Sequence, residues 1–183
     1  MGDPLSPFLS FSRRRFFRSS MRAILQRVSH AQVTAGQRLL GRIGHGLVVF
    51  LGVGKEDTLG EVRDMVEKII NLRVFENDGG RFDRSLLDVG GEVLVVSQFT
   101  LYGDCRKGRR PSFTDAAHPQ QALPLYERFI EELRAKGVHV ESGRFGEKME
   151  VSLVNQGPVT IWLEMASSVG RAAGEATFEG SKA

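Results

Sequence analysis

Two short segments of the chain hold the residue types and spacings with the most chemical potential. The first consists of Ser97, Gln98, Phe99 and Thr100, and it directly follows the apolar run 92–96. Hydroxyl and amide groups at the end of a buried strand can bind a polar substrate, although Ser and Thr in such places often satisfy only nearby backbone groups. The second segment is 155–160, with the sequence Asn-Gln-Gly-Pro-Val-Thr. We expect the function to depend on how segments 97–100 and 155–160 meet.

Segment 155–160 is unusual because it places a proline in a strand context. Proline cannot donate to a β-ladder and therefore belongs at an edge or a bulge. Gly157 before Pro158 allows backbone geometries that other residues avoid. Together they can hold a bent, cis segment whose carbonyl groups point outward as a rigid pair of acceptors. A plain turn is the alternative interpretation of the same residues.

A basic segment follows residues 97–100. Its cationic residues are Arg106, Lys107, Arg109 and Arg110. Such a cluster either binds a polyanion or forms a solvated loop. The overall charge of the chain does not decide between these two roles. Four of the 25 basic residues and one of the 22 acidic residues lie in positions 1–20. Positions 21–183 therefore contain 21 of each and have no net charge. Only the basic segment itself argues for a nucleic-acid partner.

Several classes of site are excluded by the sequence. No G-x-S-x-G nucleophile elbow occurs. Cys105 is the only cysteine, so a disulfide framework and a cysteine-based metal site are excluded. Its cationic neighbours can lower the pKa of the thiol, but no partner histidine is evident. The histidines lack ligand spacing, and we expect neither a metal nor a cofactor. The longest apolar run, 46–53, is too short to cross a bilayer, and the composition is that of a cytoplasmic protein.

Hydrophobic periodicity predicts an α+β fold, with two main helices and about six strands that form a small barrel-like sheet. Strand patterns cover 22–33, 39–53, 92–102, 138–142, 149–153 and 159–163, mostly joined as hairpins. Thr58 and Glu61 have capping-box spacing and predict the start of the first helix. The second helix is expected to begin in earnest only at Pro124. Residues 75–88 have the composition of a loop.

The ends of the chain differ in composition from its centre. Residues 1–20 are rich in Arg and Ser and lack periodicity, as in a transit peptide, an upstream translation start or a cloning remnant. Residues 165–183 are rich in Ala, Ser and Gly. We therefore predict disorder for 1–20 and 165–183, and one folded domain over 21–164.

Taken together, four motifs resemble the D-aminoacyl-tRNA deacylase family. They are Met-Arg-Ala-Ile-Leu-Gln-Arg-Val at 21–28, Ser-Gln-Phe-Thr-Leu-Tyr-Gly at 97–103, Lys-Gly-Arg-Arg-Pro-Ser-Phe at 107–113 and Asn-Gln-Gly-Pro-Val-Thr at 155–160. They occur in the family's order and cover essentially the whole body from Met21 to Glu164.

The resemblance implies a homodimer that hydrolyses the ester of D-aminoacyl-tRNA at its terminal adenosine. Ser97, Gln98, Phe99 and Thr100 would then line the adenosine and ester site. Gly157 and Pro158 would form a cis pair that enters the partner's pocket, holds the substrate ammonium and excludes an L side chain. Arg27 would brace that pair, Asn155 and Thr160 would belong to the same substrate-binding segment, and the basic segment would bind tRNA.

None of these motifs supplies a histidine or carboxylate as a general base. Catalysis would therefore depend on positioning, on backbone donors to an oxyanion near residues 98–100 and on a neighbouring ribose hydroxyl. Two other functions remain open. One is a non-catalytic dimeric RNA-binding module in which Phe99 or Tyr102 stacks on bases. The other is a hydrolase with Thr100 as nucleophile, for which no base is found.

Overall fold

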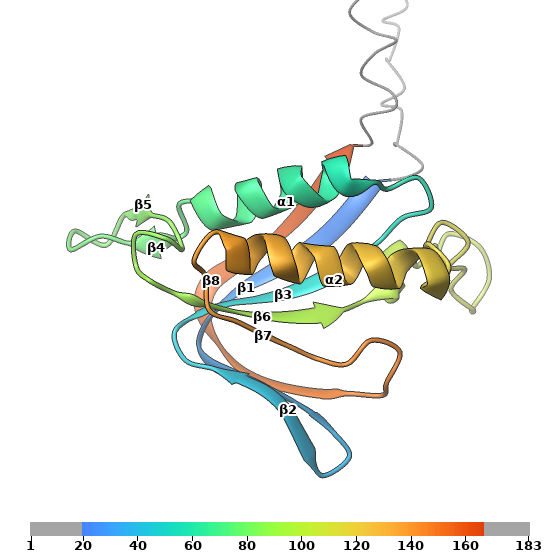
Figure 1. Cartoon of the computed structure of the whole chain (residues 1–183), viewed down its shortest axis with the longest axis horizontal. Coiled ribbons are helices and arrows are strands. Elements are labelled where there is room, and N and C mark those ends of the chain that lie inside the picture. Colours follow the sequence, from blue (N-terminus) through green and yellow to red (C-terminus); the bar gives the residue numbers. More distant parts are fainter. Residues whose placement is uncertain (1–19, 167–183) are drawn as a thin grey trace, which may run out of the picture.

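A computed structural model describes residues 20–166 (Figure 1). The elements, in chain order, are β1 (Ser20–Ala35), β2 (Arg38–Ile43), β3 (Gly46–Gly52), α1 (Leu59–Asn71), β4 (Phe75–Glu76), β5 (Phe82–Arg84), β6 (Glu92–Ser97), the 3-10 helix η1 (Phe99–Tyr102), α2 (Pro119–Ala135), β7 (Val140–Ser142) and β8 (Glu150–Ala166). Among these residues no helix combines the length and the apolar character that crossing a membrane requires.

The main sheet is mixed. Its strand order is β2-β1-β3-β6-β7, and β8 pairs with β1. β1 is antiparallel to β2, β3 and β8, whereas β3 and β6 are parallel, as are β6 and β7. The expectation that the strands are mostly joined as hairpins is therefore wrong for these two parallel pairs. Parallel neighbours need a crossover, and α1 and α2 lie on the two connections.

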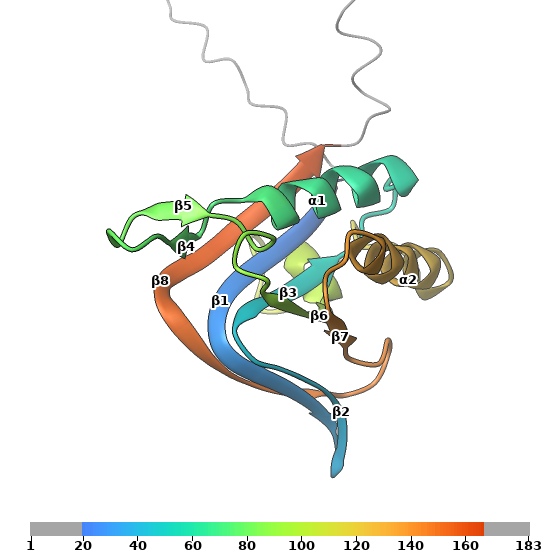
Figure 2. The same ribbon diagram turned by 60° about the vertical axis from the view of Figure 1, so that its left-hand side comes forward.

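Strong curvature of the long strands β1 and β8 nearly closes the sheet into a barrel. In Figure 2 both strands bend near their middle, and their far halves, together with β2, fold back beneath β3, β6 and β7. The pairing of β1 with β8 shifts register on either side of Val28, which is where a bulge allows a strand to bend. The expected barrel-like sheet with two helices is present.

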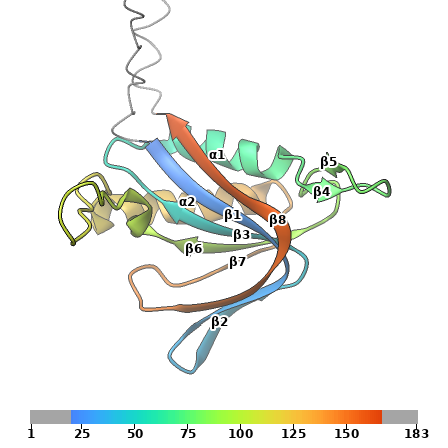
Figure 3. The ribbon, with the colours of Figure 1, turned by 180° about the vertical axis from the view of Figure 1, so that it is seen from behind.

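Two apolar cores follow from this curvature. One face of β1, β3 and β6 packs against α1 and α2, which lie side by side on the same side of the sheet (Figures 1 and 3). The opposite face, with Val48, Leu94 and Val96, packs against the folded-back strands. Successive residues such as Val48 and Val49 serve different cores because strand side chains alternate between faces. This alternation explains why β3 and β6 are apolar at almost every position.

The helix starts were predicted with mixed success. The capping box at α1 is confirmed: the Gly60 amide donates to Thr58 Oγ1, and the Thr58 amide donates to Glu61 Oε2. The expectation that the second helix begins at Pro124 is wrong. α2 begins at Pro119, where a missing N–H costs nothing, and it continues through Pro124 with its apolar face buried.

Two other expectations concern loops and ends. Residues 75–88, expected to be a loop, contain the short strands β4 and β5, which pair around the turn at 77–80. Most of the two segments predicted to be disordered, 1–20 and 165–183, lies outside the described residues. The first two residues of β1, Ser20 and Met21, pair with the last two residues of β8, Ala166 and Met165.

Candidate active site

Residues 97–100 lie where the central strand β6 ends. Ser97 is opposite Leu51 of β3 in the parallel ladder, and the Gln98 amide donates to the Leu51 carbonyl oxygen at 2.8 Å. The chain then turns into η1, and the Phe99 side chain is 58% exposed. The buried strand therefore presents residues 97–99 at its exposed end, as the sequence predicted.

Tyr102 fixes the position of η1 against the strands below. Its hydroxyl donates to the Ser20 carbonyl oxygen at 2.6 Å and lies 3.3 Å from that of Gly52. Burial raises the pKa of Tyr102, so its hydroxyl stays a donor. The ring packs directly over Gly52, where a Cβ atom would come within 2.9 Å of Tyr102 Cε2 and 3.1 Å of the Gln98 carbonyl oxygen. A glycine at this position allows η1 to approach β3 closely.

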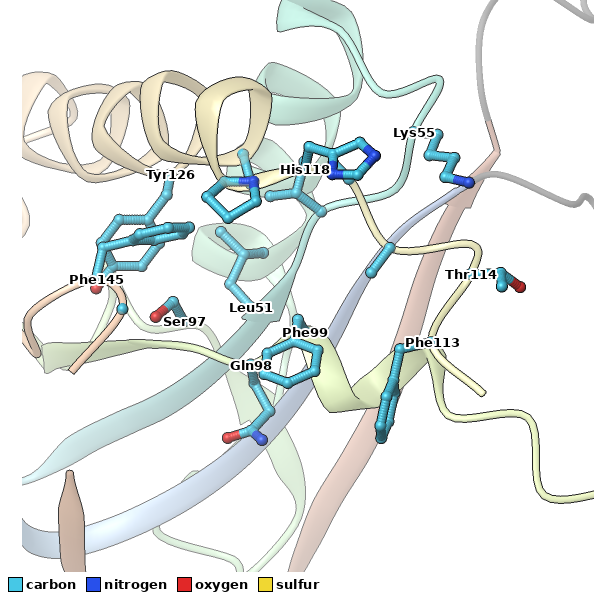
Figure 4. Close-up of a pocket in the computed structure, with 16 residues that line it drawn as sticks. Leu51, Lys55, Ser97, Gln98, Phe99, Phe113, Thr114, His118, Tyr126 and Phe145 are labelled. Atoms are coloured by element: carbon cyan, nitrogen blue, oxygen red, sulfur yellow. The ribbon is translucent and has the colours of Figure 1, made fainter. Parts of the chain in front are cut away.

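A cavity of about 550 Å³ opens beside residues 97–99 (Figure 4). Its walls come from the ends of β3 and β6, the 113–119 stretch, the first turns of α2 and the 145–146 turn. It is lined by Leu51, Val53, Lys55, Ser97, Gln98, Phe99, Phe113, Thr114, Ala116, Ala117, His118, Pro119, Ala122, Tyr126, Phe145 and Gly146. Thr100 is adjacent in sequence but is not part of the lining. An apolar cavity with a few polar groups is the usual form of a small-molecule site.

Phe99 and Phe113 form one wall of this cavity. Their rings pack edge to face with centroids 5.1 Å apart and an interplanar angle of 76°. Phe113 is carried by a loop that backbone hydrogen bonds between Asp104 and Ser112 close at 2.7 and 3.0 Å. The aromatic contact therefore joins segment 97–100 to the end of the loop that carries the basic segment.

The polar groups of segment 97–100 bond to one another. The Gln98 side-chain amide donates to the Thr100 hydroxyl. No histidine or carboxylate within residues 20–166 is paired by a hydrogen bond with the hydroxyl of Ser97 or Thr100. The backbone amides of Phe99 and Thr100 have no acceptor in the same part of the chain. These two amides are available as donors to a ligand.

Four lining residues with functional side chains escaped the sequence analysis. Tyr126 and Phe145 form a tilted ring pair with centroids 5.8 Å apart, while Lys55 and His118 lie at the exposed rim. The Tyr126 hydroxyl donates to the Val95 carbonyl oxygen at 3.0 Å, and burial raises its pKa. Tyr126 lies on the buried face of α2 and belongs to the apolar core as well as to the cavity lining. The sequence carries no local signal for the other three.

Segment 155–160 bulges out of β8 at the bend. The Asn155 side-chain amide donates to the Arg27 and Val159 carbonyl oxygens at 2.9 and 3.0 Å, which closes the bulge at its base. The Thr160 hydroxyl donates to Asn155 Oδ1 at 3.1 Å. Between them the Gly157–Pro158 peptide bond is cis, as expected from the sequence. Both Gly157 and Pro158 are exposed.

Arg27 lies behind the bulge and is almost fully buried. Its guanidinium donates to the Val74 carbonyl oxygen at 2.6 Å, to Glu76 at 3.1 Å and to the Gly157 carbonyl oxygen at 3.5 Å. Its Nε has no partner within residues 20–166. Arg27 therefore contacts the segment that the sequence analysis expects it to brace. None of residues 155–160 lines the cavity at 97–100 in the same chain.

The basic segment forms the exposed tip of the 104–112 loop. Arg106 forms two hydrogen bonds with Asp104, at 2.8 and 2.7 Å, and these hold the pKa of that carboxyl well below its usual range. Lys107, Arg109 and Arg110 form no ion pair with another described residue. The charge of Arg106 is therefore partly neutralised, and the other three cations point to solvent.

Within residues 20–166, no cluster of three or more His, Cys, Asp or Glu side chains is arranged to hold a metal ion. Cys105 lies exposed on the 104–112 loop, and no histidine within residues 20–166 hydrogen-bonds to it.

Comparisons with known proteins identify the family of this chain. The sequence profile of the D-Tyr-tRNA(Tyr) deacylase family matches residues 24–164. Proteins named D-aminoacyl-tRNA deacylase from Roseiflexus castenholzii and Thermus aquaticus are 59% and 57% identical to this chain. These alignments cover 80% and 82% of this chain, and 93% and 99% of the relatives.

Two solved structures share the fold. One, described as the c-Myc DNA unwinding element binding protein, superposes with a TM-score of 0.73 at 44% identity and covers 78% of this chain and 97% of its own. The other, described as a probable eukaryotic D-amino acid tRNA deacylase, has a TM-score of 0.72 at 21% identity and covers 80% of this chain and 100% of its own. At 21% identity the second comparison supports the fold alone.

Proposed function

Since this chain belongs to the D-Tyr-tRNA(Tyr) deacylase family, we propose that it hydrolyses the ester bond of D-aminoacyl-tRNA in the cytoplasm and releases the D-amino acid and tRNA. The observation that carries the proposal is the cavity at residues 97–99, which combines an apolar lining with amide and hydroxyl groups. Such a cavity suits a terminal adenosine joined to an amino acid.

The reaction proceeds without a protein base. Water attacks the ester carbonyl carbon, and backbone amides of segment 97–100, that of Phe99 among them, donate to the oxygen that becomes negative. The bond between that carbon and the ribose oxygen then breaks, and the ribose oxygen takes up the proton that the attacking water loses. The adjacent ribose hydroxyl assists proton transfer, since Ser97 and Thr100 have no base beside them. Gln98 orients the site through its hydrogen bond to Thr100.

Chirality is selected by a second copy of the chain. In a homodimer, the exposed Gly157 and Pro158 of one protomer enter the cavity of the other, where their carbonyl oxygens hold the substrate ammonium and leave no space for an L side chain. Two features support this assembly. Residues 155–160 lie outside their own chain's cavity, and Phe50, Ile24 and Trp162 form an apolar row across β3, β1 and β8, with Trp162 49% exposed. A row of this kind suits a protein–protein interface.

The direct test is to incubate the protein with D-tyrosyl-, L-tyrosyl- and glycyl-tRNA and follow release of the amino acid. We expect cleavage of the D-tyrosyl and glycyl esters, because glycine has no side chain to exclude, and no cleavage of the L-tyrosyl ester. Cleavage of D and L esters at equal rates would contradict chiral selection. Binding without cleavage of any ester would contradict the enzymatic function.

Mixing two inactive variants tests the cross-subunit arrangement. One variant carries Gln98→Ala in the cavity, and the other carries alanine at both Gly157 and Pro158. After exchange of subunits, a mixed dimer contains one intact cavity served by one intact Gly-Pro pair, so about a quarter of all sites should regain activity. If the Gly-Pro pair served its own chain, the mixture would stay inactive.

Nucleic-acid binding without catalysis is the second candidate function. It is favoured by the name of the 44% identical solved structure, a DNA unwinding element binding protein, and by the exposed cations of the basic segment. The incubation with charged tRNA separates the two, because a binding module retains the ester.

A further inference from the structure

The cavity has polar groups at two separate ends. In Figure 4 Ser97 and Gln98 lie on one side, and Lys55 and Thr114 lie on the other, with Phe99 between them. His118 also lines the cavity, and Figure 4 shows its ring on the same side as Lys55. No residue from 106–110 lines the cavity, so the basic segment does not supply its charge. The positive group that belongs to the cavity itself is the Lys55 ammonium.

The backbone of Lys55 is held firmly while its side chain is exposed. The Lys55 amide donates to the Asp115 carbonyl oxygen at 3.3 Å, and the Lys55 carbonyl oxygen accepts from the Gln121 side-chain amide at 2.7 Å. The preceding residue, Gly54, forms a β-bridge with Ala116. Lys55 forms no ion pair within residues 20–166. A fixed backbone with an exposed ammonium at a cavity rim is well suited to bind an anion from the ligand.

We propose that Lys55 is a substrate-binding residue whose ammonium pairs with the 5′-phosphate of the terminal nucleotide of the charged RNA. This inference rests on the proposed function, which places the ester at the end of the cavity with Ser97 and Gln98. In any polynucleotide the last ribose carries the ester on one side and its phosphate on the 5′ carbon. A nucleotide that occupies the apolar middle of the cavity therefore directs this phosphate toward the end with Lys55. His118 and Thr114 provide further hydrogen-bonding groups there.

The experiment compares two inhibitors that differ only in the phosphate. Both are amide analogues of D-tyrosyl-adenosine, in which nitrogen replaces the ribose 3′ oxygen, and one of them carries a 5′-phosphate. Wild type should bind the phosphorylated analogue about three- to tenfold more tightly, as expected for one exposed charge-assisted contact. Lys55→Met keeps most of the length of the side chain but removes its charge. It should reduce this ratio to about one without changing the affinity for the unphosphorylated analogue. Lys55→Arg should retain the ratio.

Lys148→Met is the matched control, because Lys148 is exposed and does not line the cavity. It should keep the wild-type ratio. Raising the salt concentration should reduce the ratio of wild type but not that of Lys55→Met. If Lys55→Met keeps the ratio, even with weaker binding of both analogues, the phosphate contact is refuted while the proposed function stands. If neither analogue inhibits the wild-type protein, the proposed function fails, and this inference fails with it.

Discussion

The rings of Phe99 and Phe113 pack edge to face, 5.1 Å apart between centroids, and thereby connect the end of β6 to the loop that carries the basic segment. An aromatic pair of this geometry contributes about 0.5–1.5 kcal/mol beyond the area that it buries. Both rings also line the cavity. Any change at Phe113 therefore removes a contact of the Phe99 ring in the cavity wall.

Phe113→Ala should raise the KM for D-aminoacyl-tRNA by roughly two- to tenfold, because it removes the ring that supports Phe99 and opens one wall of the cavity. The kcat should change much less. Steady-state kinetics with D-tyrosyl-tRNA provide the measurement. Leu39→Ala is a control, since Leu39 lies on β2 and is 49% exposed. An unchanged KM for Phe113→Ala would show that the ring pair does not shape the substrate site.

The paired change Lys107→Ala with Arg109→Ala should flatten the salt dependence of tRNA binding. If each cation contacts one phosphate, the slope of log affinity against log salt should fall by roughly 1.4–1.8 in total. Arg106→Ala should have a smaller effect, because Asp104 already shares its charge. The double change Arg38→Ala with Arg42→Ala on β2 removes the same charge elsewhere and should leave the slope unchanged. Equal slopes for wild type and the Lys107 and Arg109 variant would identify the basic segment as a solvated loop.

Thr100→Ala should lower the single-turnover rate by no more than about tenfold, which corresponds to the loss of one hydrogen bond from Gln98. A nucleophilic Thr100 would instead make the variant lose several orders of magnitude. Thr100→Ser keeps the hydroxyl and should behave as wild type. Mass spectrometry of the protein quenched during turnover provides a second measurement. An acyl group attached to Thr100 would establish the nucleophilic mechanism.

Gly157→Ala separates a role in folding from a role in the partner's site. In the single chain a Cβ atom at Gly157 meets nothing within 4 Å, so the free energy of unfolding should stay within about 0.5 kcal/mol of wild type. If Gly157 enters the cavity of a second copy, the added methyl group should crowd the substrate and reduce cleavage of D-tyrosyl-tRNA. Denaturant unfolding and deacylation assays on the same preparation provide the comparison. Full activity in the stable variant would place Gly157 outside the substrate site.

Asp57→Asn should change how stability depends on pH. Asp57 is 4% exposed, its Oδ2 accepts from the Gly54 amide at 2.6 Å, and its Oδ1 has no partner among residues 20–166. Burial raises the pKa of Asp57 to about 7, and Glu61 adds to the rise while Arg22 opposes it. Because the pKa of Asp57 is higher in the folded protein than in the unfolded chain, protonation of Asp57 stabilises the fold. This stabilisation is complete below about pH 4 and is lost as pH rises to about 7.

The free energy of unfolding of wild type relative to Asp57→Asn should therefore fall between pH 4 and pH 7 and stay level above pH 7. Even one third of the shift corresponds to roughly 1.4 kcal/mol. Urea unfolding at pH 4.5, 6 and 8 measures this difference. Parallel pH profiles for wild type and Asp57→Asn would contradict the raised pKa.

The sequence by itself determined the features that depend on neighbouring residues. The capping box of Thr58 and Glu61 was readable because both its bonds lie within one helical turn. The apolar run 92–96 identified a buried strand, although the strand predicted over 92–102 ends at Ser97 and is followed by η1. A glycine before a proline marked the bulge in β8. The motifs at 97–103 and 155–160 identified the family, because each is a continuous stretch.

Tertiary structure alone decided what depends on long-range pairing. Lys55, His118 and Phe145 come from three distant parts of the chain and meet at one cavity because β3 pairs with β6 and Gly54 bridges to Ala116. No local sequence pattern indicates that these three residues line the same cavity. The parallel pairing of β3, β6 and β7 was missed for the same reason, since hydrophobic alternation does not record the direction of a neighbouring strand. The separation of segment 155–160 from the cavity of its own chain is likewise set by the bend in β1 and β8, which a linear motif cannot express.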